Sequence, residues 1–310
     1  MKKILVIGEI LVEIMADTKG NGFLEPTALT GPFPSGAPAI FADQAARIGQ
    51  PVALISAVGD DDFGRINLER LKRDHVDISG IYIDPDKPTG SAFVRYRTNG
   101  TRDFVFNIKH SASGNLHETD AVKHLVATVD HIHVMGTSLS SPEFVAFNLK
   151  AAKAVRARGG TVSFDPNLRK EMLDAPGVAD AMVNLIALTD LYLPSDAELT
   201  LLTRSKDKDS AIAELLQSGV KAIVHKQGIE GASYHSAHEN LTIKAFPVEE
   251  IDPTGAGDCF GAIFTSLWLR DVSPAECLNF AAAAGAIAVT QRGPMEGTSD
   301  FATLTKFLGR

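Results

Sequence analysis

Short apolar runs alternate with amphipathic segments along almost the whole chain. Runs rich in aliphatic and β-branched residues predict buried strands at 4–8, 52–58, 131–135, 161–164, 191–193 and 222–225. Helical periodicity lies between them, at 38–48, 63–73, 142–158, 212–217 and 256–269. This alternation predicts an α/β fold with a mostly parallel sheet and helices on both of its faces. Sheets of this kind bind their ligands at the carboxyl ends of the strands.

Two segments interrupt the alternation. Residues 9–16 continue as an extended segment where a crossover helix would be expected, and 89–97 and 101–108 have the pattern of paired strands around the Asn99-Gly100 turn. We therefore predict one domain, 1–310, from which 9–34 and 89–110 project as a small β-sheet. This sheet is either a lid over a ligand cleft or a hairpin that forms a dimer contact, and the pattern leaves both open.

Composition and charge exclude several classes of function. Hydrophobic residues make up 45% and charged residues 22% of the chain, which is an ordinary globular mixture. The chain has a formal charge of −8, so it lacks the excess of basic residues that is typical of a nucleic-acid binder. It also lacks a polybasic segment that could anchor it to a membrane. The two cysteines are too few for a disulfide framework, and Glu9 interrupts the apolar N-terminal run that would otherwise imitate a signal peptide. A cytoplasmic location is the expectation.

The segment from Asp252 to Asp258, with the sequence DPTGAGD, carries the most informative chemistry. Its small residues let a ligand approach the backbone closely, and the unpaired amides at the start of the following helix favour an anion such as a phosphate. Asp258 is then either a helix cap or a base that takes the proton of an alcohol attacking a phosphoryl group. The two roles are compatible.

Other chemistries are less well supported. The chain has no G-x-x-x-x-G-K-[ST] sequence, and Gly255-x-Gly257 lies in the last fifth of the chain rather than after the first strand, where a dinucleotide fingerprint belongs. A dinucleotide-dependent oxidoreductase stays an alternative, tested by whether a nicotinamide cofactor binds. His131 and His133 share one side of a strand without an obvious third ligand. Cys259 lies at a helix start, where a thiol pKa can fall, although packing is its simpler role.

Three motifs in order resemble one known family, the ribokinase-like or PfkB-type carbohydrate kinases. The segment 252–258 is similar to the C-terminal signature of that family. Ser35-Gly36-Ala37-Pro38-Ala39, with Gly49 and Gly59 downstream, is similar to its N-terminal signature. Between them, the sequence FDPNLR at 164–169 resembles a segment of fructokinase-like and ketodeoxygluconate-kinase-like members. The matches cover nearly the whole chain.

The resemblance implies a three-layer α/β/α sandwich with a small β-sheet lid and an ATP–Mg²⁺ phosphate donor. It implies that Asp258 is the base and that Gly255, Ala256 and Gly257 form the anion hole. The residues that match nucleotide-binding positions are Lys226, Gly228, Gly231, Ala283, Gly285 and Ala286. Glu198 would help to hold magnesium through water, and Asp252 and Thr254 match positions that bind a monovalent cation, which makes potassium a candidate activator.

Three positions depart from the family pattern. Ile40 stands where members usually carry an asparagine that hydrogen-bonds the sugar, and Glu13 stands where an aspartate is common. Ser195 replaces the asparagine of the motif that ends at Glu198. These departures indicate an unusual substrate pocket within a working kinase, although they would also suit a catalytically inactive sugar sensor.

A sugar pocket needs several short polar groups. The candidates are Glu13, Ser35, Gly36, Asn107, Lys109 and Arg169. Arg169 would hold either a carboxylate of a sugar acid or the phosphates of ATP. We predict a ketohexose such as fructose or tagatose as substrate, with 2-keto-3-deoxygluconate as the alternative and ribose or a nucleoside third. A homodimer through the lid is a further expectation.

Overall fold

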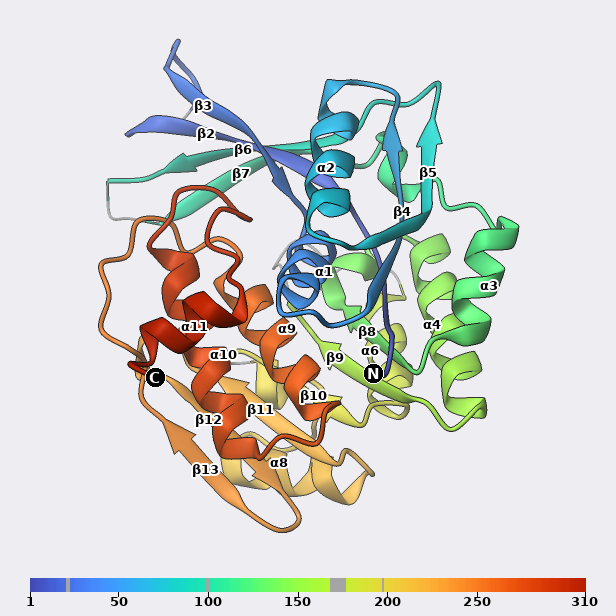
Figure 1. Ribbon diagram of the computed structural model, residues 1–310, viewed down its shortest axis with the longest axis vertical. Coiled ribbons are helices and arrows are strands. Elements are labelled where there is room, and N and C mark those ends of the chain that lie inside the picture. The colour runs from blue at the N-terminus through green and yellow to red at the C-terminus, as the bar shows by residue number, and fades with distance from the viewer. Residues whose placement is uncertain (21–22, 99–100, 168–176, 197) are drawn as a thin grey trace.

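A large sheet forms the centre of the molecule in the computed structural model, which describes residues 1–310 except 21–22, 99–100, 168–176 and 197. The strands of this sheet are β1 (Ile4–Ile7), β4 (Val52–Gly59), β5 (Asp77–Asp84), β8 (His131–Met135), β9 (Thr161–Asp165), β10 (Leu191–Tyr192), β11 (Ala222–Lys226), β12 (Ala232–Ser236) and β13 (Asn240–Ile243). Their order is β13-β12-β11-β10-β9-β8-β1-β4-β5 (Figure 1). The strands from β11 to β5 in this order pair in parallel, and β12 and β13 add antiparallel pairs at one edge. The predicted mostly parallel sheet is confirmed.

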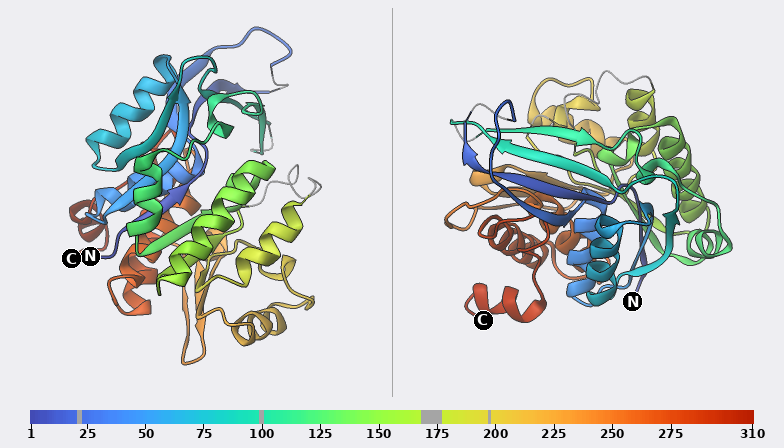
Figure 2. Two further views of the ribbon diagram at one scale, coloured as in Figure 1. Left: turned by 90° about the vertical axis from the view of Figure 1, so that its right-hand side faces the viewer. Right: turned by 90° about the horizontal axis from the view of Figure 1, so that it is seen from above.

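Helices cover both faces of the sheet (Figure 2). One face packs against α1 (Ala37–Arg47), α2 (Asp62–Arg73), α9 (Ala256–Trp268), α10 (Pro274–Val289) and α11 (Phe301–Phe307). The other packs against α3 (Asp120–Thr128), α4 (Pro142–Ala157), α6 (Val178–Ile186), α7 (Glu198–Leu201) and α8 (Lys208–Gln217). Strand β1 is buried by helices on both faces. Its Ile4 and Val6 pack in the core on the α1 and α9 face, whereas Leu5 and Ile7 pack in the core on the α4 face. A parallel strand buried on both faces is therefore apolar throughout.

A second, smaller sheet projects beyond one end of the large one (Figure 1). It consists of β2 (Leu11–Lys19), β3 (Leu29–Ser35), β6 (Gly90–Tyr96) and β7 (Arg102–Asn107), in the order β3-β2-β6-β7. Strands β6 and β7 pair antiparallel, as the sequence predicts, while the Asn99-Gly100 turn lies outside the described residues. The description of the chain as one domain with a lid stays a prediction.

The observed elements include several that the sequence analysis did not name, among them helices α3, α6, α10 and α11 and strands β12 and β13. Helix α8 begins at Lys208 rather than 212, because the Asp207 side chain accepts a hydrogen bond from the Ser210 amide at 2.9 Å and caps the helix there. Strand β5 was not predicted, since it is only partly buried at the sheet edge and lacks an apolar run. In the part of the chain that the structure describes, no helix is long and apolar enough to cross a membrane.

Candidate active site

A cavity of about 300 Å³ lies between the small sheet, the carboxyl ends of the large-sheet strands and the start of α9. Segments that follow strands of the large sheet contribute Glu9, Asn167, Ser195 and Glu198, and β11 itself contributes Lys226. The small sheet contributes Leu11, Glu13, Ser35, Arg102 and Phe104. The α1 end adds Gly36, Ala37 and Ile40, and the α9 end adds Pro253, Thr254, Gly255, Gly257 and Asp258. The position agrees with the rule that such sheets bind ligands at their carboxyl edge.

The start of α9 has the backbone of an anion site. Gly255 is the N-cap residue, with φ of 82° in the left-handed region that favours glycine. A Cβ atom on Gly255 would lie 2.5 Å from the carbonyl oxygen of Pro294, so the close approach also requires glycine. Ala256, Gly257 and Asp258 form the first turn, where amides lack partners within the helix and the helix dipole is positive. These amides suit a phosphate oxygen.

Asp258 lies in this first turn, is only 7% exposed and borders the cavity. The alternative that Asp258 caps α9 is wrong, because Gly255 occupies the N-cap position. The Asn167 side chain donates a hydrogen bond from Nδ2 to Oδ1 of Asp258 at 3.1 Å. Asn167 is itself held by its backbone amide, which donates to Oδ1 of Asp165 at 3.2 Å. A carboxyl group is thus placed beside a site built for an anion.

Lys226, at the end of β11, brings a buried positive charge to the same place. Its ammonium group forms an ion pair with Asp165, and a Cβ atom on Gly257 would lie 3.7 Å from Nζ. Burial alone would lower the pKa of Lys226, but the charges of Asp165 and Glu198 raise it above its ordinary value. Lys226 therefore stays protonated next to the glycine-rich turn.

Glu13 and Ser35 form the polar side of the cavity nearest the small sheet. The Ser35 hydroxyl donates to Oε1 of Glu13 at 2.8 Å, and the two side chains are 1% and 4% exposed respectively. Gly36 and Ile40 border the same space from the start of α1. The sequence predicted Glu13, Ser35 and Gly36 as sugar contacts, and the structure brings all three together with Asp258.

A family model described as pfkB family carbohydrate kinase matches residues 1–300. The chain belongs to the PfkB family of carbohydrate kinases. Probable fructokinase-7 from Arabidopsis thaliana is 33% identical over 301 residues, which cover 94% of this chain and 88% of that protein. The E. coli protein provisionally named Ribokinase II, solved in a complex with ATP and Mg²⁺, is 47% identical with a TM-score of 0.94 and full coverage of both chains. A double mutant of fructokinase from Vibrio cholerae O395, with fructose, ADP and potassium ion bound, is 25% identical with a TM-score of 0.84 over 99% of this chain and 98% of that one.

Several predicted site residues of this PfkB kinase lie elsewhere. Asn107 and Lys109 are exposed and do not border the cavity, and Arg169 lies outside the described residues. The predicted nucleotide positions other than Lys226 also do not border this cavity. Gly228 and Gly231 lie in the turn between β11 and β12, and Ala283, Gly285 and Ala286 lie in α10, which packs against α9. Their roles stay predictions.

Glu198, the residue predicted to hold magnesium through water, borders the cavity of this PfkB kinase, and its role toward the ion stays a prediction. Its side chain borders the cavity, and Oε2 accepts a hydrogen bond from the Ser195 amide at 2.7 Å. Among the described residues, no group of three or more His, Cys, Asp or Glu side chains could hold a metal by itself. Magnesium commonly keeps several waters and takes its remaining ligands from substrate phosphates. Glu198 would then orient water rather than enclose the ion.

Asp252 and Thr254, the positions predicted for a monovalent cation, already have partners within the chain, one of them a guanidinium. Oδ1 of Asp252 accepts hydrogen bonds from the Thr254 amide at 3.0 Å and hydroxyl at 2.7 Å, and Oδ2 accepts one from the Gly293 amide at 3.1 Å. The guanidinium of Arg102 donates to Oγ1 of Thr254 and lies 3.8 Å from Oδ1 of Asp252. A second cation at these side chains would be repelled by that guanidinium.

Cys259 has the packing role that the sequence analysis named as the simpler one. It is fully buried at the start of α9, and burial followed by the nearby Asp258 charge raises the pKa of its thiol well above the ordinary value. A protonated, inaccessible thiol reacts poorly, so Cys259 is a packing residue and not a reactive one.

Sequence reasoning missed Arg102, Phe104 and Glu9 as cavity residues. Arg102 and Phe104 lie on β7 of the small sheet, and Glu9 lies in the connection between β1 and β2. Side chains alternate between the two faces of β7, so Arg102 and Phe104 share one face. The sequence would have indicated both residues if it had also shown which face of β7 borders the cavity.

Proposed function

We propose that this PfkB kinase transfers the γ-phosphoryl group of ATP to a hydroxyl of a neutral ketohexose of the fructose or tagatose type. The observation that carries the proposal is the position of Asp258, a carboxyl group that faces the cavity from the first turn of α9. A carboxylate beside a phosphate site is electrostatically unfavourable unless it accepts a proton there. Fructokinases are prominent among the relatives of this chain.

In the proposed reaction, Asp258 takes the proton of the sugar hydroxyl as the hydroxyl oxygen attacks the γ-phosphorus. The bond between that phosphorus and the β,γ-bridging oxygen breaks, and the electron pair leaves with ADP. Asn167 orients the carboxyl group of Asp258, while the amides of the α9 start and the charge of Lys226 stabilise the negative charge on the phosphoryl oxygens.

The phosphate donor is proposed to be ATP with Mg²⁺. The α9 amides, Lys226 and Glu198 are the groups of this chain that would hold it. When bound, the ion neutralises charge on the β- and γ-phosphates. The related E. coli structure with ATP and Mg²⁺ supports this choice.

The charges around the cavity favour a neutral sugar. Its two described cations are already opposed by carboxylates, since Lys226 pairs with Asp165 and Arg102 lies 3.8 Å from Asp252. Glu9 and Glu13 add two further carboxyl groups. Carboxyl groups accept hydrogen bonds from sugar hydroxyls, but they disfavour a carboxylate on the ligand.

A sugar acid is the second candidate substrate, and the position of Arg102 at the cavity favours it. The guanidinium borders the cavity, and its planar fork suits a carboxylate. A 2-keto-3-deoxy sugar acid would have to compete with Asp252 and Thr254 for this group.

The small sheet would close over either sugar and exclude water from the phosphoryl group. A cytoplasmic location and a homodimer through the small sheet stay predictions.

The test is ADP release with Mg²⁺ across fructose, tagatose, other ketohexoses, 2-keto-3-deoxygluconate, ribose and a nucleoside. We expect turnover with one neutral ketohexose that exceeds turnover with the sugar acid by at least about tenfold in kcat/KM. Preference for the acid would transfer the assignment to the second candidate. ATP and sugar binding without any ADP release would support an inactive sensor, and binding of a nicotinamide cofactor instead of ATP would contradict the kinase assignment.

A further inference from the structure

The small sheet reaches across to the loop that opens α9. Tyr96 on β6 and Arg102 on β7 are cross-strand partners at its far end. Arg102 donates to the hydroxyl of Thr254, 152 residues further along the chain. Burial and the charge of Asp252 raise the pKa of Tyr96 to about 12, which is consistent with a carboxylate close to this pair. The end of the sheet thus meets a buried negative charge.

Asp252 organises the backbone around the anion site. It is 1% exposed, and its three hydrogen bonds join the loop at Thr254 to the segment at Gly293. The next residue after Gly293, Pro294, is the one whose carbonyl packs against Gly255. Asp252 therefore sets the position of the helix start that would receive the phosphate. A buried carboxylate so close to that site would repel a phosphate unless a positive charge offset it.

We propose that Arg102 supplies this positive charge, so that the kinase does not depend on a monovalent cation. The hydrogen bond from its guanidinium to Thr254 and the 3.8 Å approach to Asp252 place the charge on the two residues at which an added cation would bind. Arginine stays protonated at any working pH, so the charge is permanent. Arg102 acts through Thr254 and Asp252 on the α9 start, and is a positioning residue.

The placement of Arg102 also couples this charge to the small sheet. A free ion could reach Asp252 at any time, whereas the guanidinium arrives only when β7 lies against the α9 loop. The anion site is therefore complete only in the arrangement in which Arg102 and Phe104 also border the cavity. Completion of a site by closure is an established way of limiting hydrolysis of the phosphate donor.

Arg102→Ala tests the proposal, with Arg95→Ala as the matched control. Both side chains are 26% exposed and both lie in the β6–β7 pair, but Arg95 forms its ion pair with Asp103, at 2.7 Å. Turnover is measured in potassium chloride and in choline chloride at one ionic strength. We expect the wild type and Arg95→Ala to differ by less than about twofold between the salts. Arg102→Ala should lose at least about tenfold in kcat in choline chloride and regain most of it in potassium chloride.

A second readout needs no substrate. If potassium binds only where the guanidinium has been removed, it should raise the Tm of Arg102→Ala and leave the Tm of the wild type unchanged. Arg102→Lys keeps a positive charge, so its turnover and Tm should not depend on potassium. This variant also shows whether the effects of Arg102→Ala come from the lost charge or from a folding defect. The proposal is overturned if the wild type itself requires potassium. It is also overturned if Arg102→Ala responds to the salts as the wild type does and only its KM for the sugar rises, because Arg102 would then bind the sugar.

Discussion

Asn167 and Asp258 meet through a hydrogen bond of 3.1 Å, although 91 residues separate them in the chain. Asn167 follows β9 and Asp258 lies in the first turn of α9, so the contact joins the carboxyl edge of the large sheet to the proposed anion site. Asn167 has φ of 36°, a left-handed conformation that asparagine tolerates better than most residues. The contact holds the carboxyl group in one orientation toward the cavity.

Asp258→Asn should keep affinity for ATP and lose turnover. The amide cannot accept the hydroxyl proton, and general-base catalysis typically contributes about 10²–10⁴-fold in rate. ATP binding is measured by calorimetry and kcat by ADP release. Asp209→Asn is the matched control, since Asp209 also lies in the first turn of a helix but is exposed and does not border the cavity. A rate for Asp258→Asn close to that of Asp209→Asn would refute the role of Asp258.

Gly255→Ala should impair both stability and activity, and Gly177→Ala separates the causes. The two glycines are N-cap residues with φ of 82° and 84° and the same ψ of −9°, so alanine is strained equally at both, by about 1–2 kcal/mol. At Gly177 the new Cβ atom meets no atom of the described residues within 4 Å, whereas at Gly255 it lies 2.5 Å from the Pro294 carbonyl oxygen. Urea unfolding and ADP release are the measurements.

The expected result is that Gly177→Ala loses only the strain energy and keeps its kcat. Gly255→Ala should lose more stability and most of its turnover, because the Pro294 segment or the α9 start must move. Equal effects of the two substitutions would show that close packing at Gly255 does not matter for the anion site.

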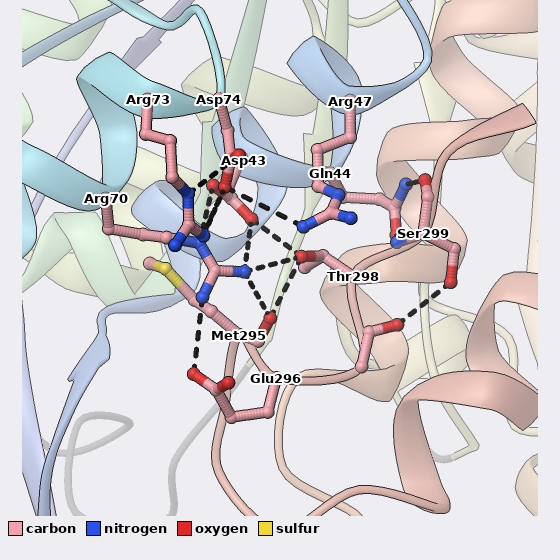
Figure 3. A network of polar contacts seen from close by, with 11 residues as sticks. Asp43, Gln44, Arg47, Arg70, Arg73, Asp74, Met295, Glu296, Thr298 and Ser299 are labelled. Atoms are coloured by element: carbon pink, nitrogen blue, oxygen red, sulfur yellow. Dashed lines mark hydrogen bonds and ion pairs between the residues drawn. The ribbon is translucent and has the colours of Figure 1, made fainter.

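Arg70→Met should strongly destabilise the fold. Figure 3 shows the Arg70 guanidinium between α1, α2 and the segment after α10, where it contacts Asp43, Asp74, Glu296, Thr298 and the Met295 carbonyl. Asp43 is fully buried, and burial raises its pKa to about 6 despite the Arg70 charge. Removal of the arginine leaves this carboxyl group without its ion pair, at a cost of about 3–5 kcal/mol.

Arg73→Ala is the control for this network. Arg73 pairs with the same Asp74 but is 63% exposed, and exposed ion pairs contribute about 0–1 kcal/mol. Chemical denaturation at neutral pH compares the two variants. Turnover of Arg70→Met should also fall, because the segment 293–298 that Arg70 holds carries the Gly293 amide bound to Asp252. A loss of stability no greater than that of Arg73→Ala would contradict the role given to Arg70.

His131 should make the fold sensitive to acid. Burial lowers the pKa of this histidine from 6.5 to about 3, and its two ring nitrogens bond the hydroxyls of Thr161 and Ser163. Between these pKa values the unfolded chain binds a proton that the folded chain does not. Stability is therefore fully present above about pH 6.5 and is lost as the pH falls, by up to about 1.4 kcal/mol per pH unit.

His131→Gln should reduce this slope by about one proton between roughly pH 5 and 6, as measured by urea unfolding across that range. His238→Gln, at an exposed position, should leave the slope unchanged. The glutamine variant is less stable at neutral pH if its amide cannot reproduce both hydrogen bonds, but its pH slope is the quantity compared. An unaltered slope would show that His131 titrates normally in the folded protein.

The contrast between Asn107 and Arg102 shows how the pleat of a strand limits prediction from sequence. The hairpin of β6 and β7 was predicted correctly, because its pattern and turn signal are local. Arg102 and Phe104 border the cavity, whereas Asn107, an odd number of residues along the same strand, is exposed. Adjacent side chains of a strand point to opposite faces. A prediction that is wrong by one residue therefore assigns every side chain of the strand to the wrong face.

The sequence by itself determined the alternation of strands and helices, the family and the chemistry at 252–258. These depend on periodicity, glycine conformation and helix-end amides, which act over a few residues and can be read locally. Only the tertiary structure decided that Arg102 lies on Thr254 and that Arg70 joins α2 to the segment after α10. These contacts join residues more than 150 positions apart. Their formation depends on how the small sheet and the helices pack against the large sheet, and no local pattern specifies that packing.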